Sequence, residues 1–152
     1  MAIIDEAHVP ATLIQPGNLR HAPIGALLHV PGGSTYLMAS FPSGTPGEGQ
    51  KWLIDIDTFK ARGVQSDDDL TKVAVIENIS FDVVPFSACD PEDRQPGDVL
   101  AGGGMLLIVG DNSGEKITLR LNLMINDKGL LAYGRWRMSA GGVIVAAKLF
   151  DD

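Results

Sequence analysis

Three groups of acidic residues come nearest to a pattern that could do chemistry in this sequence. They are Asp55 with Asp57, the run Asp67-Asp68-Asp69, and the group Asp90, Glu92, Asp93 and Asp98. Paired carboxylates can perform acid–base catalysis in glycoside hydrolysis. An acidic loop can also bind calcium, although the twelve-residue order of an EF-hand is absent. Because Asp is favoured in turns for its own backbone hydrogen bonds, we interpret the three groups as solvated turn residues.

The remaining reactive residue types give no recognisable catalytic or cofactor signature. Cys89 is the only cysteine, and its acidic neighbours would raise its pKa and weaken it as a nucleophile. The histidines His8, His21 and His29 lack the short spacing of a zinc pair. Gly102-Gly103-Gly104 precedes an apolar run, whereas a phosphate-binding glycine loop follows a strand and opens a helix. We therefore expect a protein that is not an enzyme and has no cofactor and no metal site.

The composition indicates one domain built from short strands. The length of 152 residues suits a single domain, residues 1–152, and 18 glycines with nine prolines favour tight turns over long helices. Residues 1–23 are predicted to form an extended N-terminal arm. A net charge of −7 disfavours a nucleic-acid partner, and no run approaches the roughly 18–20 apolar residues of a membrane span. With no signal peptide evident, we expect a soluble cytoplasmic protein without a membrane partner, or a virion component if the source is viral.

The elements that must position any functional side chain are predicted from apolar alternation. The predicted strands of the first half are Ile24–Val30, Thr35–Phe41, Lys51–Asp57 and Val73–Val84, with one helical turn at Thr58–Gly63. The fold class that follows is all-β, with about eight strands. We expect an antiparallel β-sandwich, with an up-and-down β-barrel as the alternative.

Residues 105–150 give the strongest pattern and predict a four-stranded antiparallel meander. Lys116–Asn126 alternates without a fault, and the segments on either side of it run from Asp or Asn to Gly, as in a hairpin with a G1 bulge. The predicted register places Ile108 opposite Ile117, Leu119 opposite Trp136, Ile117 opposite Met138, and Met138 opposite Val143. One face of the meander then becomes entirely apolar, which supports the assignment.

The other face of this meander mixes apolar side chains with arginines, and it is the candidate interface. Its residues are Arg120, Tyr133, Arg135, Arg137, Met105, Leu107, Met124, Leu131 and Phe150. The predicted register sets Arg120 opposite Arg135, a destabilising pair unless an anion lies between them. Three kinds of group could cover this face. They are the protein's own acids (Asp55, Asp57, Glu77 and Asp82), a partner subunit, or a small anionic ligand.

Two classes of function remain open at this point. The first is a non-enzymatic structural or interaction protein that associates with itself or with another protein subunit, as a homo-oligomer or in a larger assembly. A virion coat-associated or decoration protein is one concrete form. The arginine and apolar residues of the candidate interface favour this class. The alternative is a small-molecule-binding β-barrel carrier protein.

Overall fold

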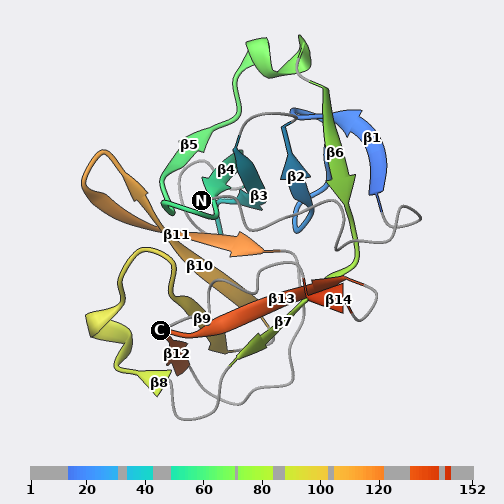
Figure 1. Ribbon diagram of the computed structural model, residues 1–152. Coiled ribbons are helices and arrows are strands. Elements are labelled where there is room, and N and C mark those ends of the chain that lie inside the picture. Colours follow the sequence, from blue (N-terminus) through green and yellow to red (C-terminus); the bar gives the residue numbers. More distant parts are fainter. Residues whose placement is uncertain are drawn as a thin grey trace.

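The computed structural model describes residues 14–30, 34–42, 49–70, 72–83, 88–102, 105–121, 131–140 and 143–144 of the chain. These residues form an almost entirely β structure of two antiparallel sheets, one of eleven strands and one of three (Figure 1). The sheets are not closed into a barrel. The predicted all-β, sandwich-like class is confirmed, and the alternative of an up-and-down barrel is wrong. The number of strands is larger than expected because two predicted strands are divided in two and because residues 14–18, 61–63, 88–89 and 99–102 form strands that were not predicted.

The large sheet runs in an order that differs from the order of its strands in the sequence. Along its main path lie β1 (Ile14–Asn18), β6 (Lys72–Ile76), β2 (Leu27–His29), β3 (Thr35–Ser40), β11 (Glu115–Leu121), β10 (Met105–Asn112), β9 (Val99–Gly102), β12 (Leu131–Tyr133) and β8 (Ala88–Cys89). Two further strands, β4 (Lys51–Asp55) and β5 (Ala61–Gly63), continue from β3. The small sheet has the order β14 (Val143–Ile144), β13 (Trp136–Ala140) and β7 (Ile79–Val83). Short 3₁₀ helices, η3 (Ser66–Leu70) and η4 (Pro91–Asp93), lie in two of the connections.

The hairpin of β10 and β11 confirms the alternation of the sequence but not its register. Ile108 lies opposite Leu119, whereas the prediction placed it opposite Ile117, two residues earlier on the partner strand. The loop consists of only Ser113 and Gly114, both with positive φ (54° and 91°), which is the geometry of a type I′ turn. Because side chains alternate with a period of two, a shift by two residues leaves each of them on its predicted face.

The second hairpin of the predicted meander does not form in the described residues, so this prediction is wrong. Strand β11 pairs with β10 and β3, whereas β12 pairs with β9 and β8, and β13 pairs with β7 in the small sheet. The expected pairs Leu119–Trp136, Ile117–Met138 and Arg120–Arg135 are therefore absent there. A break at Gly134 and Arg135 separates β12 from β13, and this break sends the two strands to different sheets.

The third hairpin, of β13 and β14, forms with the same two-residue shift as the first. Ala140 pairs with Val143, where the prediction paired Met138 with Val143. The rest of the predicted meander, residues 122–130 and 145–150, lies outside the described residues.

Two features of the first half depart from the predicted elements. The single strand expected at Val73–Val84 is divided into β6 and β7, because Asn78 adopts a left-handed conformation (φ 57°) directly after Glu77. Glu77 is the residue that interrupts the alternation. The helical turn expected at Thr58–Gly63 is instead a turn with Phe59 at φ 58°, followed by β5.

The expected strands at residues 24–30, 35–41 and 51–57 are confirmed by β2, β3 and β4. In the predicted N-terminal arm, residues 14–18 form β1 at one end of the large sheet, and residues 1–13 lie outside the described residues. In the part of the chain that the structure describes, no helix has the length and apolar character needed to cross a bilayer.

Apolar side chains fill the space between the sheets and cover the second face of the large sheet. The main core joins strands of both sheets, including Leu106, Ile108, Leu119, Trp136 and Met138, all at most 2% exposed. A second cluster lies on the opposite face of β2, β3 and β4 under the segment 19–26, and a third lies on the opposite face of β9, β10 and β12.

Trp136 of β13 connects the small sheet to two loops next to the large sheet. Its Nε1 donates a hydrogen bond of 2.6 Å to the carbonyl oxygen of Gly97. Its indole packs against Phe81 of β7, with ring centroids 4.9 Å apart, and against Phe59, at 6.2 Å. The small sheet, the turn before β5 and the loop after η4 therefore meet at one side chain.

Candidate interaction surface

A continuous row of side chains crosses the large sheet on the face that bears Leu107. The strand registers place six residues in line, in the order Ser40, Arg120, Leu107, Leu100, Ala132 and Cys89. Register partners on neighbouring strands project to the same face of a sheet. Met105, two residues from Leu107 along β10, also lies on this face. We call these seven residues the Leu107 face.

The Leu107 face has a buried apolar base and a partly exposed rim. Leu100 and Ala132 are 4% and 0% exposed and pack with Val109. Met105, Leu107, Arg120 and Cys89 are half-buried. The structure thus brings together three of the predicted interface residues, Met105, Leu107 and Arg120, and sets the arginine directly beside the leucine.

Two other predicted residues belong to the opposite side of the sheet. Tyr133 lies opposite Val99 and packs against the main core. Leu131 lies opposite Ala101, so its register position is on the side of Tyr133. The expectation that both share a face with Leu107 is wrong, because β12 is next to β9 and not next to β11.

The remaining arginines are separated from Arg120. Arg135 is half-buried in the break between β12 and β13 and takes part in interactions of its own. Arg137 is the register partner of Asp82 in β7, one of the acids expected to neutralise the arginines. The like-charge pair of Arg120 and Arg135 does not arise in the described strands, because β11 pairs only with β10 and β3 there. Met124 and Phe150 lie outside the described residues.

Cys89 is the end of the row farthest from Arg120, and its side chain contacts Asp98, which directly precedes β9. The Cys89 thiol donates a weak hydrogen bond to Asp98 Oδ2 at 3.9 Å. Burial, followed by the charge of Asp98, raises the pKa of the Cys89 thiol above its ordinary value. The thiol therefore stays protonated near neutral pH and is a poor nucleophile.

The acidic groups serve the backbone, as the turn interpretation expects. Asp55 Oδ1 accepts from the N–H of Asp57 at 2.8 Å, and Asp90 Oδ1 accepts from the N–H of Glu92 at the start of η4. Asp68 accepts two bonds from Arg62, at 3.1 and 3.2 Å, and one from the N–H of Gln65. These carboxylates stabilise turns and do not converge on one point.

The histidines and potential metal ligands are equally dispersed in the described ranges. His29 Nδ1 is 2.9 Å from Thr35 Oγ1, and His21 lies in the turn after β1. His8 lies outside the described residues. Among the residues that the structure describes, no three His, Cys, Asp or Glu side chains are grouped closely enough to hold a metal ion.

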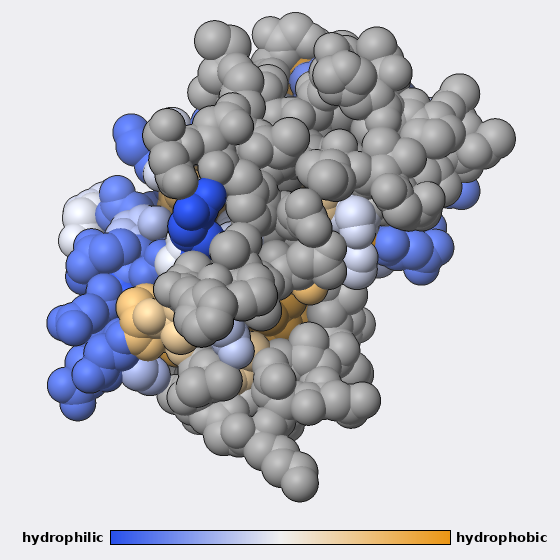
Figure 2. All heavy atoms as spheres, turned by 60° about the horizontal axis from the view of Figure 1, so that its bottom comes forward, coloured by the Kyte–Doolittle hydropathy of each residue, from blue (hydrophilic) through white to orange (hydrophobic). Residues whose placement is uncertain are grey.

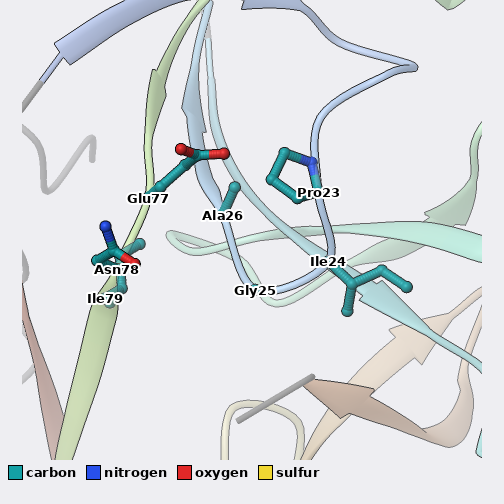
Figure 3. A pocket seen from close by; sticks show the side chains of 7 residues that line it. All are labelled: Pro23, Ile24, Gly25, Ala26, Glu77, Asn78 and Ile79. Carbon is teal, nitrogen blue, oxygen red and sulfur yellow. The ribbon is translucent and has the colours of Figure 1, made fainter.

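Several hollows open at the surface of the described residues. The hollow in Figure 3 has a volume of about 260 Å³ and lies where the chain passes from the large sheet to the small one, between Pro23–Ala26 and Glu77–Ile79. Glu77 points across it toward Pro23 and Ala26 (Figure 3). This exposed carboxylate is the one charged group of its lining, so the hollow offers little to hold a ligand.

A second hollow, of about 380 Å³, has a basic lining that the sequence did not indicate. It is lined by Arg20, His21, Gln50, Lys51 and Val64. Arg20 and His21 fall in the predicted arm and Lys51 in a predicted strand far along the chain, so no local motif joins them. Only the pairing of strands brings these residues together.

The surface that carries the end of the large sheet is not uniformly polar. Figure 2, in which the lower part of Figure 1 with β8 and β12 is turned forward, shows apolar residues at the surface beside hydrophilic ones. Comparison with protein-family models, with curated proteins and with solved structures finds no match for this chain.

Proposed function

We propose that this protein is a non-enzymatic subunit of an assembly and that it contacts a second copy of itself through the Leu107 face. A virion coat-associated or decoration protein is one concrete form of such a subunit. The observation that carries the proposal is the half-buried group Met105, Leu107 and Arg120 on one sheet face. Arginine and methionine are enriched at protein interfaces, where they surround a buried apolar centre.

Two opposite charges on this part of the sheet favour a second copy as the partner. Arg120 lies on β11, and Asp98, which accepts from the Cys89 thiol, directly precedes β9 on the other side of β10. Two strand spacings of about 4.8 Å separate β11 from β9, or about 10 Å, and Leu107 of β10 lies between them. In a two-fold dimer each patch meets its own copy in the reverse direction, so Arg120 of one copy approaches Asp98 of the other while Leu107 and Met105 pack at the centre. A charged pair of this kind is strongest when both groups are desolvated.

Sedimentation velocity of the wild type and of two variants tests the proposal. Leu107→Glu places an unpaired charge in the apolar centre, and Arg120→Glu sets like charges opposite each other, so each should weaken self-association by at least tenfold. Lys72→Glu is the matched control, because Lys72 is exposed on β6, away from the row, and the substitution reverses the same charge.

Circular dichroism establishes that each variant retains its strands. Unchanged self-association of Leu107→Glu or Arg120→Glu would contradict the proposed contact. An equal loss of self-association in Lys72→Glu would contradict it as well.

The carrier function is not the one we propose. A carrier of the barrel type needs a closed sheet around its ligand, whereas these sheets are open and the largest core side chains are completely buried against one another.

A further inference from the structure

The basic hollow is formed by three segments that are distant in the sequence. Arg20 and His21 come from the turn after β1, Gln50 and Lys51 from the start of β4, and Val64 from the end of β5. Its volume of about 380 Å³ is at the lower end of the roughly 300–1,000 Å³ typical of small-molecule sites.

Backbone hydrogen bonds hold the turn that carries Arg20 and His21. The carbonyl of Asn18 accepts from the N–H of His21 at 3.2 Å, and its side-chain Oδ1 accepts from the N–H of Arg20 at 3.0 Å. Lys51 Nζ donates to the carbonyl of Ala22 at 2.9 Å, which ties β4 to the same turn. An ammonium has three donors, so this bond occupies one of them.

The sign of the charge at this place is opposite to that of the whole chain. The chain carries a net charge of −7, yet the lining has an arginine, a lysine and a histidine and no carboxylate. Asp68 interacts electrostatically with Arg20, and its oxygens also accept two bonds from Arg62 and one from the N–H of Gln65. This one carboxylate is shared by Arg62 and Arg20, so Arg20, Lys51 and Arg62 together still exceed its charge.

We propose that this hollow binds a small organic phosphate. The guanidinium of Arg20 can grip two phosphate oxygens at once, and Lys51 adds a point charge that is already held by Ala22. The amide of Gln50 adds hydrogen-bonding groups, and Val64 offers an apolar wall to the organic part of the ligand. The site is independent of self-association through the Leu107 face.

A titration followed by amide chemical shifts in NMR tests this site, with glycerol 3-phosphate as the probe at about 0.15 M salt. At this ionic strength charges more than about 8 Å apart are screened, so weak attraction to the surface as a whole is suppressed. Glycerol 3-phosphate should shift the amides of Arg20, His21 and Lys51 saturably, and glycerol alone should not.

Two variants and one control separate a site from general attraction. Lys51→Gln and Arg20→Gln should each weaken binding about tenfold, the effect of losing one charge-assisted hydrogen bond. Arg20 is exposed, so Arg20→Gln keeps the test valid if Lys51→Gln disturbs the fold. Lys116→Gln is the control, because Lys116 Nζ also donates to a backbone carbonyl, that of Arg94, at 3.1 Å, and its loss removes the same charge elsewhere.

Inorganic phosphate distinguishes the two sources of this chemistry. Stronger binding of glycerol 3-phosphate identifies an organic phosphate as the ligand class, and equal binding of both supports the same phosphate site with the free anion as its ligand. No saturable response to either probe, or an equal loss of affinity in Lys116→Gln, would overturn the proposal.

Discussion

Replacing Trp136 by phenylalanine should destabilise the protein by about 2–4 kcal/mol. Trp136 is 2% exposed, and its Nε1 donates the 2.6 Å hydrogen bond to Gly97. Phenylalanine leaves that buried carbonyl without its donor, at a cost of about 1–3 kcal/mol. The smaller ring also loses apolar area against Phe59 and Phe81, for about 1 kcal/mol more. In a domain of this size the sum lowers Tm by roughly 5–15 °C.

Urea unfolding followed by far-ultraviolet circular dichroism measures this difference, and Trp52→Phe is the matched control. Trp52 is half-buried in the same core, but its Nε1 has no hydrogen-bond partner among the described residues. The same substitution there loses apolar area alone and should destabilise by about 1 kcal/mol. An equal loss of stability at the two positions would refute the assigned role of the bond to Gly97.

Two further predictions concern charge and backbone strain. For Asp68, burial alone raises the pKa, but the bonds from Arg62 and the Gln65 N–H lower the pKa below its ordinary value of 3.8 overall. The stabilisation is therefore present above that value and is lost as pH falls through the folded pKa, so Asp68→Asn should destabilise by about 1–2 kcal/mol at pH 7 and by less near pH 3 in urea titrations. Gly97→Ala should destabilise by about 2–3 kcal/mol, because φ is +97° and a Cβ would lie 2.7 Å from the Phe59 ring. Gly114→Ala, with φ +91° and no atom within 4 Å, should lose only about 1 kcal/mol when both variants are measured by urea unfolding, and equal losses would exclude the contact with Phe59.

Alternation along single strands was predictable from the sequence, because one strand needs only its own pattern. The faces of Ile108, Leu119 and Leu107 were therefore correct, although the hairpin register was not. Asp111-Asn112-Ser113-Gly114 suits both a four-residue loop and a two-residue type I′ loop, and the two differ by a shift that preserves every face.

The order of strands was not predictable in the same way. Hairpin turns favour pairing between neighbours in the sequence, whereas β11 pairs with β3 and β12 pairs with β8 and β9. Long-range pairings of this kind depend on the packing of the whole core and leave no local signal. For this reason the sequence placed Tyr133 on the wrong side of the sheet and did not indicate the basic hollow.

The left-handed residues mark the places where local patterns end. Asn78 divides one apolar run into strands of two sheets, and Asn tolerates that conformation better than most residues. Phe59, at φ 58°, has no such tolerance and is held by its bonds to neighbouring strands, since its carbonyl accepts from Asp111 and its N–H donates to Asp55. The left-handed conformation of Asn78 could be suspected from the sequence, and that of Phe59 could not.

Light scattering coupled to size-exclusion chromatography tests the proposed self-association most directly, on the wild-type chain over a range of loading concentrations. Association through the Leu107 face predicts a molar mass that reaches at least twice that of one chain as concentration rises. A molar mass equal to one chain at every concentration would contradict it.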